Sequence, residues 1–366
     1  MKKIAIFLVV LLLAGSFAFA GGSSESAASG TRADVFWYTF ADTYLASVRN
    51  AMIEQGNSMP NLRITHHDSQ ERQDLQAQMV QTAITQGTNL LIVNIVTTGS
   101  EDAAMNIVNM ARNANIPIIF FNREVSDAVI RSYANAAFVG TDADEAGYMQ
   151  GQAVANFLLR QANWTGNVSN FDLNGDGIIR YIMLRGEHGN AEAFGRTLYA
   201  VQEANRLLEG RLRLQPSAAN ETSTQYPDDG ISNYFLYANW SAATAANLMR
   251  TALTAHSLTN GAIELILANN DDAGIGAIEA LRERGYNTGT GNFIPVFGVD
   301  ATAVAVENIR AGRMTGTILQ DGPGMARIML ELAQNIANGR QLMANTTQYN
   351  IDAGVNKIRV PYAIVE

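Results

Sequence analysis

Short apolar runs alternate with longer amphipathic stretches along most of the chain. The apolar runs are β-branched or aliphatic, as is typical of strands buried on both faces; they cover residues 35–38, 62–66, 90–96, 118–122, 138–140, 179–184, 212–214, 264–269, 296–299 and 317–319. The amphipathic stretches carry apolar residues at helical spacing; they include residues 73–86, 102–113, 145–160, 191–208, 242–255, 273–284 and 301–311. Several of them stop at a glycine, as at Gly87, Gly285 and Gly312, which is a common helix end.

This alternation predicts the α/β class, with parallel sheets covered by helices on both faces. The chain has 366 residues, more than one hydrophobic core usually accommodates. We therefore predict two Rossmann-like, doubly wound lobes in preference to one large sheet. With seven prolines and no long run of charge, composition marks no linker between the lobes.

The amino terminus has the pattern of an export signal. Lys2 and Lys3 precede an apolar run over residues 4–13, and Ala18-Phe19-Ala20 offers small residues for cleavage after Ala20. The run is shorter than the roughly 20 apolar residues of a membrane span, so a helical anchor is the weaker alternative. We expect residues 1–20 to be a signal peptide and residues 21–32 to be a flexible tether.

Cysteine and charge narrow the class of protein. The chain has no cysteine, which excludes disulfides, thiolate metal sites and a lipid-bearing cysteine at the cleavage site. Its net charge of −9 argues against nucleic acid as a partner. These features predict a soluble protein exported to the periplasm.

Two halves of the chain repeat the same local pattern. Residues 116–122 and 294–300 each read Ile-Pro, an apolar strand and a polar residue, and residues 90–94 and 265–270 form a second pair. Ligands in open α/β sheets bind just outside the carboxyl ends of the strands. The polar residues at these ends therefore indicate a cleft between two lobes, with helix capping as the alternative; they are Asn94, Asn270 and Asp300.

Residues 172–177 resemble half of a calcium loop. Asp172, Asn174 and Asp176 place oxygens at alternating positions, and Gly177 permits the sharp bend that follows. The rest of an EF-hand is missing, because Met183 stands where a bidentate Glu is needed. The pattern predicts a structural clip and not a calcium sensor.

Several longer motifs carry a resemblance to a known family. They are residues 118–124 (IIFFNRE), 139–142 (VGTD), 147–151 (GYMQG), 172–177 (DLNGDG), 268–271 (ANND) and 297–301 (FGVDA). Over residues 33–363 the chain resembles the periplasmic glucose/galactose-binding proteins of ABC transporters, within the ribose/galactose-binding type I family. The resemblance implies two lobes joined by three crossings, one of residues 33–116 and 321–359, and one of residues 117–320 and 360–366.

The resemblance also implies a set of sugar contacts. Asp42 matches the carboxylate that accepts a sugar hydroxyl, while Tyr44 and Trp240 match the aromatic residues that stack on the two sugar faces. Asn94, Arg196, Asn270 and Asp300 are the same residue types that the family has at its sugar-contact positions. Asn190, Glu192 and Gln320 differ from the family's residue types at such positions.

Such a set suits a pyranose, because planar Asp, Asn and Arg groups pair with adjacent hydroxyls and aromatic planes cover the C–H faces. Tyr44 as a core aromatic is the alternative. Phe36, Trp37 and Tyr38 are expected in the core.

A calcium ion is the cofactor that the resemblance implies. Its ligands would be Asp172, Asn174, Asp176, the backbone carbonyl of Ile178, and Glu264. Arg180 departs from the pattern, since a guanidinium cannot bind a cation. The alternatives are a water that fills the gap, replacement of the ion by Arg180 itself, or a simple turn without a metal.

An enzyme is the alternative class of protein. None of the four histidines lies in a zinc motif or beside a Gly-x-Ser-x-Gly elbow. Asp42, Glu192 and Asp300 could converge as in a glycosidase, but the resemblance accounts for them as hydroxyl acceptors. A repressor core of the same fold is disfavoured, because the chain has an export signal and no DNA-binding helices.

The expected function follows from the resemblance. It implies a monomeric, non-enzymatic receptor that delivers glucose or galactose to an ABC permease by hinge closure, with a chemoreceptor as a further partner. Ribose, xylose or an altered hexose is the alternative ligand.

Overall fold

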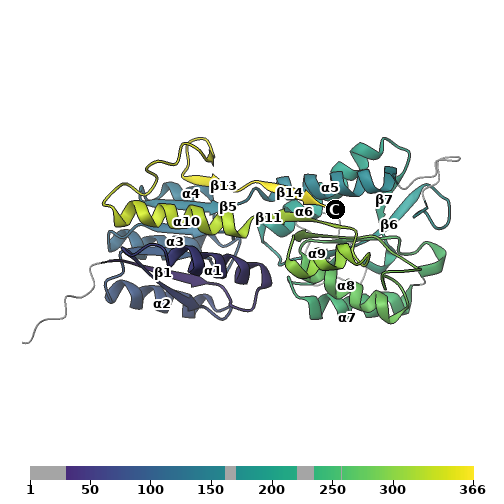
Figure 1. Ribbon diagram of the computed structural model, residues 1–366, viewed down its shortest axis with the longest axis horizontal. Coiled ribbons are helices and arrows are strands. Elements are labelled where there is room, and N and C mark those ends of the chain that lie inside the picture. The colour runs from purple at the N-terminus through teal and green to yellow at the C-terminus, as the bar shows by residue number, and fades with distance from the viewer. Residues whose placement is uncertain (1–29, 161–169, 221–234, 257) are drawn as a thin grey trace, which may run out of the picture.

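The computed structural model describes residues 30–160, 170–220, 235–256 and 258–366. The predicted signal peptide (residues 1–20), and the predicted tether up to residue 29, lie outside the described residues. Two lobes lie side by side, each built on one sheet with helices on both faces (Figure 1). Within the described residues, no helix is long and apolar enough to cross a membrane.

The first lobe holds a seven-stranded sheet in the order β12-β13-β5-β4-β3-β1-β2. All neighbouring strands are parallel except β12 and β13. The strands are β1 (Thr31–Trp37), β2 (Leu62–Asp68), β3 (Leu90–Val93), β4 (Ile118–Phe121), β5 (Ala136–Gly140), β12 (Asn350–Ile351) and β13 (Lys357–Arg359). The helices of this lobe are α1 (Thr43–Gly56), α2 (Gln73–Thr85), α3 (Glu101–Asn113), α4 (Asp127–Arg131) and α10 (Gly322–Ala337).

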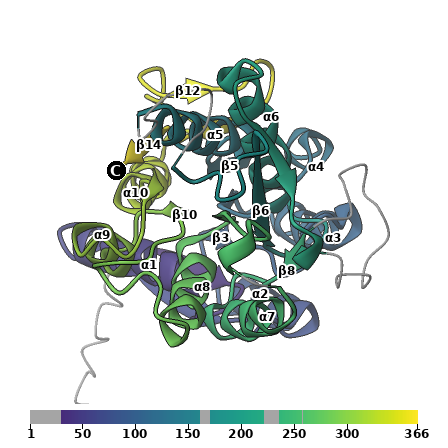
Figure 2. The same cartoon turned by 90° about the vertical axis from the view of Figure 1, so that its right-hand side faces the viewer.

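The second lobe holds a sheet in the order β14-β11-β10-β9-β6-β7, with β8 also paired to β6. Its strands are β6 (Ile178–Arg185), β7 (Arg213–Pro216), β8 (Leu236–Tyr237), β9 (Leu265–Ala268), β10 (Val296–Asp300), β11 (Gly316–Gln320) and β14 (Tyr362–Val365). Its helices are α5 (Ala143–Arg160), α6 (Ala191–Leu208), α7 (Ala242–Ala255), α8 (Asp271–Glu283) and α9 (Ala303–Arg310), with 3₁₀ turns at Ala218–Asn220 and Leu258–Asn260. Helices α5 and α6 lie together over one face of the sheet, and α7 and α8 lie together on the other (Figure 2).

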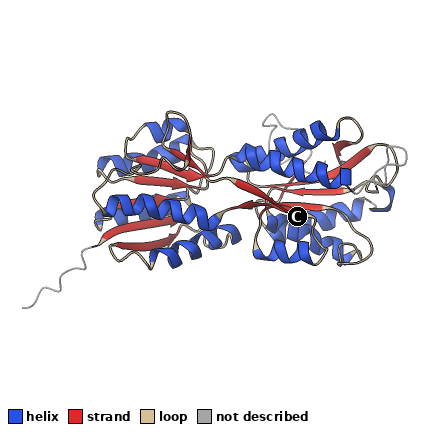
Figure 3. Ribbon diagram, turned by 45° about the horizontal axis from the view of Figure 1, so that its top comes forward, coloured by secondary structure: helices blue, strands red, loops and turns tan. Residues whose placement is uncertain are grey.

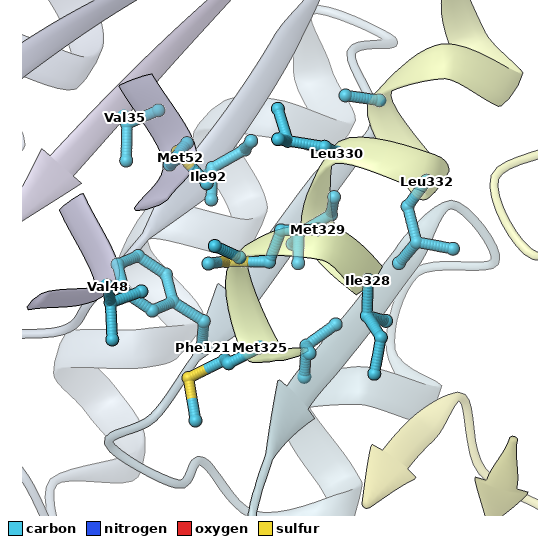
Figure 4. Close-up of a cluster of buried hydrophobic side chains, with 14 of the residues drawn as sticks. Val35, Val48, Met52, Ile92, Phe121, Met325, Ile328, Met329, Leu330 and Leu332 are labelled. Atoms are coloured by element: carbon cyan, nitrogen blue, oxygen red, sulfur yellow. The ribbon is translucent and has the colours of Figure 1, made fainter. Parts of the chain in front are cut away.

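The strands bury both of their faces, as their continuous apolar runs predict. Val35 and Trp37 of β1 belong to the core beneath α1 and α10, while Phe36, between them in sequence, belongs to the core on the opposite face. Figure 4 shows the first of these cores, with Met325 and Met329 of α10 beside the strands. The expectation that Phe36 and Trp37 are core residues is confirmed.

The chain crosses between the lobes three times: after β5, after β11 and between β13 and β14 (Figure 3). The predicted first boundary, between residues 116 and 117, is wrong. Strands β4 and β5 are hydrogen-bonded into the first sheet, because Leu91 to Val93 pair with Ile118 to Phe120. The first crossing therefore follows Gly140, whereas the returns near residues 320 and 360 lie where the prediction placed them.

Candidate functional site

A cavity lies between the lobes at the carboxyl ends of their strands. Together with the solvent at its mouth it has a volume of about 390 Å³. It is lined by residues of both lobes, namely Tyr38, Asp42, Tyr44, Asn122, Arg123, Asn190, Glu192, Arg196, Trp240, Asn270, Asp300 and Gln320. Every predicted sugar contact except Asn94 is in this lining.

Asn94 lies below the cavity and not in its wall. Its side chain is fully buried, Nδ2 donates to the carbonyl of Phe121 at 3.0 Å, and Oδ1 accepts from the backbone N–H of Tyr38 at 3.3 Å. It neither contacts the cavity nor caps a helix. Its amide instead ties the end of β3 to the ends of β1 and β4, and so supports the floor of the site.

Three residues of the first lobe complete the wall and were not predicted: Tyr38, Asn122 and Arg123. Tyr38 donates a hydrogen bond from its hydroxyl to Asp42 Oδ2 at 2.8 Å, and the Arg123 guanidinium lies 4.1 Å from the centre of the Tyr38 ring. Tyr38 also packs against the edge of the first-lobe core, as expected, and it reaches the cavity because β1 ends at Trp37 and the next side chain leaves the sheet. The Asn-Arg pair directly after an apolar strand is a signal that could have identified the other two.

Asp42 begins helix α1 and presents a carboxylate to the cavity. Its Oδ1 accepts the backbone N–H of Leu45 at 2.8 Å, so the helix fixes the direction of the side chain. Two residues later, Tyr44 lies in the cavity wall and in the first-lobe core at once. Burial, and then the nearby Asp300, raises the pKa of Tyr44 well above its usual value. The two interpretations of Tyr44, core residue and ligand contact, are thus compatible.

Arg196 is the centre of a buried polar network. Its Nη1 donates to the carbonyl of Asn269 at 2.8 Å, and its Nη2 donates to the Tyr362 hydroxyl at 2.8 Å and to Gln320 Oε1 at 3.1 Å. Burial lowers the pKa of Arg196, but Tyr362, Glu192 and Asp300 outweigh it and raise that pKa above its usual value. The guanidinium is therefore a fixed cation in the wall of the cavity.

Glu192 and Gln320 hold this arginine. Glu192 forms an ion pair with Arg196 at 2.8 Å and accepts a hydrogen bond from Thr141 Oγ1 at 2.8 Å. Gln320 Nε2 donates to the same Thr141 hydroxyl at 3.1 Å, and Tyr362 OH lies 2.8 Å from Glu192 Oε2. Since Thr141, Gln320 and Tyr362 stand at the three crossings, the network joins the cavity to the hinge.

Trp240 covers the second-lobe side of the cavity. Its backbone is left-handed, with φ +65°, and its carbonyl accepts a hydrogen bond from Asn270 Nδ2 at 3.1 Å. The indole lies against the backbone of Gly186, where an added Cβ would come within 2.3 Å of the ring. Gly186 is thus required for the position of the indole.

Capping explains two of the predicted contacts only in part. Asn190 and Asn270 cap α6 and α8 through their Oδ1 atoms, and both also line the cavity. Asp300 caps no helix, since α9 is capped by Thr302. Burial raises the pKa of the Asp300 carboxyl well above its usual value, and Arg196, whose Nη1 lies 3.8 Å away, opposes this shift.

Three donors in the wall have no hydrogen-bond partner among the described residues. They are the Nε atoms of Arg123 and Arg196 and the indole Nε1 of Trp240. Buried N–H groups are normally paired, so these three indicate a ligand or water that carries acceptors. The carboxylates of Asp42 and Asp300 line the same cavity and can accept hydrogen bonds from such a ligand.

The two lobes contact each other around the cavity. Thr43 Oγ1 of α1 donates to Asp272 Oδ2 of α8 at 2.7 Å, and Arg123 pairs with Glu187. The backbones of Gly99 and Gly189 are so close that a Cβ on Gly99 would lie 2.6 Å from the Gly189 carbonyl oxygen. The structure is therefore a closed arrangement of the lobes.

The predicted calcium loop lies at the start of β6, away from the cavity. Asp172 accepts three backbone N–H groups of the loop, from Gly175, Asp176 and Gly177. Glu264 accepts the backbone N–H groups of Leu173 and Arg180, and burial raises its pKa to about 7. Within the described residues, no three His, Asp or Glu side chains gather as a group able to hold a metal.

Two α/β lobes, three crossings and a polar cavity between the lobes define the class of type I periplasmic binding proteins. Residues 33–341 match the family model described as periplasmic binding protein domain, and the chain belongs to this family. It is 30% identical over 367 aligned positions to the D-galactose/methyl-galactoside binding periplasmic protein of Haemophilus influenzae, an alignment that covers 100% of this chain and 97% of that protein.

Two solved structures share the fold. A solute-binding protein of Bacillus halodurans with bound myo-inositol has a TM-score of 0.68 at 24% identity, over 92% of this chain and 95% of that one. A protein of Actinobacillus succinogenes with bound D-allose has a TM-score of 0.68 at 19% identity, over 92% of this chain and 97% of that one. All three are named as binding proteins and not for a reaction, in agreement with the prediction that the chain is not an enzyme.

Proposed function

We propose that the protein is a periplasmic receptor for a monosaccharide, D-galactose or D-glucose, and delivers it to an ABC permease. The observation that carries this proposal is the mixture of groups that face one cavity. Asp42 and Asp300 offer acceptors, while Arg123, Arg196 and Trp240 offer N–H groups without a partner among the described residues. A sugar hydroxyl both donates and accepts, so a ring of hydroxyls can satisfy both sets at once.

The aromatic residues support a ring-shaped ligand. Trp240 and Tyr44 line the same cavity. Flat aromatic surfaces cover the C–H faces of a pyranose and exclude water from the hydrogen bonds at its rim. A linear or strongly charged solute would leave this surface unused.

The relative from Haemophilus influenzae, aligned over the whole chain, favours galactose among the hexoses. Glu192 and Gln320, two of the positions that depart from the family pattern, are held by Thr141 and Arg196. They therefore act on the sugar mainly by placing Arg196. The alternative ligands are ribose, xylose, an altered hexose such as allose, and myo-inositol.

Delivery depends on closure of the lobes. Thr43–Asp272 and Arg123–Glu187 join the lobes in the closed arrangement, and a sugar bonded to both lobes adds to the stability of that state. We infer that a permease, and also a chemoreceptor, binds the closed monomer by contacts with both lobes.

Calorimetry of the purified protein against galactose, glucose, allose, ribose, xylose and myo-inositol tests the proposal. We expect a binding heat with one hexose and a much weaker one with its epimer. Asp300→Ala should nearly abolish this heat while the protein stays folded by circular dichroism. If the folded wild-type protein gives no heat with any of these ligands, the proposal is wrong.

A further inference from the structure

The loop before β6 has its carboxylate oxygens already occupied. Both oxygens of Asp172 accept backbone N–H groups at 2.8 to 3.1 Å. Both oxygens of Glu264 do the same, with Leu173 at 2.7 Å and Arg180 at 2.8 Å. These bonds give the loop its shape without help from an ion.

The third carboxylate is bound by Arg180. Its Nη2 lies 2.6 Å from Asp176 Oδ2 and its Nη1 lies 3.3 Å from Asp176 Oδ1, a two-pronged pairing that suits a guanidinium. The same Nη1 lies 4.0 Å from the buried Glu264 Oε2. Arg180 thus extends toward two of the carboxylates that the resemblance assigns to a metal.

Charge explains why such a loop needs a cation. Asp172 and Asp176 of the loop, together with Glu264 directly before β9, place three acidic groups around it, and Asp172 and Glu264 are buried. Like charges held close together repel each other, and burial strengthens the repulsion. A neighbouring positive charge, on either a metal ion or a side chain, offsets this repulsion.

We propose that the guanidinium of Arg180 takes the place of a divalent metal ion in this loop, so that the protein folds and binds its ligand without calcium. A guanidinium offers donors only and repels a second cation. The donor set therefore fits Ca²⁺ poorly in this chain, in contrast to the calcium site that the sequence resemblance implies. In this loop a side chain, and not an ion, supplies the positive charge.

The test compares melting temperatures of the purified full protein in EDTA and in millimolar CaCl₂. Wild-type protein should melt at the same temperature in both. Arg180→Gln removes the positive charge and supplies an amide oxygen that can bind Ca²⁺. This variant should therefore melt several degrees lower than wild type in EDTA and recover in CaCl₂. Arg131→Gln is the matched control, since Arg131 forms the same kind of i,i+4 ion pair with the exposed Asp127 in α4 of the first lobe; it should not respond to calcium.

Three results would overturn the proposal. They are a rise in the wild-type melting temperature with CaCl₂ that Asp176→Asn abolishes, an Arg180→Gln variant as stable as wild type in EDTA, and an Arg180→Gln variant that calcium does not restore. If Arg180→Gln fails to fold in either buffer, a calorimetric titration of wild-type protein with CaCl₂ decides: no heat supports the proposal, and a heat lost in Asp176→Asn refutes it.

Discussion

A Cβ placed on Gly186 would lie 2.3 Å from the indole of Trp240, so the absence of a side chain at one residue sets the position of the other. Gly186 comes directly after the last residue of β6, and Trp240 stands in the turn before α7. The platform on one side of the cavity therefore depends on two loops that are distant in sequence.

Replacing Gly186 with Ala should weaken sugar binding, because the indole must move away from the cavity wall. Trp240→Ala removes the platform and should cost ~1–3 kcal/mol of binding free energy, the value of a desolvated aromatic face. Calorimetry with the preferred sugar measures both. Trp240→Phe keeps a flat ring and should retain more affinity than Trp240→Ala; equal losses in the two variants would contradict stacking.

Tyr362 should matter for binding although it lies outside the cavity wall. Its hydroxyl accepts a hydrogen bond from Arg196 and lies 2.8 Å from both Thr141 Oγ1 and Glu192 Oε2. Tyr362→Phe should reduce affinity by about tenfold or more, since a hydrogen bond to a charged group contributes ~1.5–3 kcal/mol. Tyr349→Phe is the control, because Tyr349 bonds Glu331 on the outer side of α10. Equal affinities of Tyr362→Phe and wild type would show that the network does not hold Arg196.

The hydrogen bond between Thr43 and Asp272 should favour the closed state. Thr43→Val removes the donor and keeps the shape of the side chain, so affinity should fall by roughly threefold to tenfold through faster dissociation, the effect of ~0.5–1.5 kcal/mol. Stopped-flow release of the sugar measures the rate. Thr85→Val, at an exposed position of α2, should release the sugar as fast as wild type does. A normal dissociation rate in Thr43→Val would mean that this contact does not stabilise closure.

His66 should make the protein sensitive to acid. Its Nδ1 accepts a hydrogen bond from Trp37 Nε1 at 3.1 Å, and burial, with Arg49 and His67 nearby, lowers its pKa from 6.5 to about 4. Because the folded pKa is below the unfolded one, the neutral ring stabilises the fold above about pH 6.5, and this contribution is lost as the pH falls toward 4. The side chain is half-buried, so we expect the free energy of unfolding to fall by ~1–3 kcal/mol.

Urea unfolding at about pH 7 and about pH 5, on either side of the usual histidine pKa, measures this dependence. His66→Gln keeps an acceptor for the Trp37 indole but cannot be protonated. In this variant the free energy of unfolding should differ less between the two pH values than in wild type. An equal loss in wild type and His66→Gln would assign the acid sensitivity to other groups.

Much of the secondary structure was predictable because its signals are local. The predicted helices over residues 191–208 and 242–255 match α6 and α7, and each predicted strand corresponds to a strand of the structure. The strands absent from the prediction are β8, β12, β13 and β14, of two to four residues each. Runs so short carry too little periodicity to be recognised. In β13, moreover, the buried Lys357 bonds Glu124, which hides the apolar character of the strand.

The residues of the candidate site were largely predictable from the sequence, but the positions of their side chains were less so. The polar residues after strands identified the end of each sheet where the cavity lies, and nine of the ten predicted contacts line it. Asn94 lies beneath the cavity that it was expected to line, whereas Tyr38, expected only in the core, packs against the core and also lines the cavity. Each stands one residue beyond its strand, and sequence does not say which side chain turns toward the floor and which toward the cavity.

Sequence alone therefore determines the class of fold of this protein, the order of its elements and the types of group in the site, since periodicity and residue chemistry act over a few neighbours. The tertiary structure decides which sheet β4 and β5 join, how Gly186 supports Trp240, and how Tyr362 meets Arg196 across 166 residues of chain. It also shows Arg180 bonded to Asp176 in the loop. These contacts join segments that are distant in sequence, so they form only when the whole chain packs.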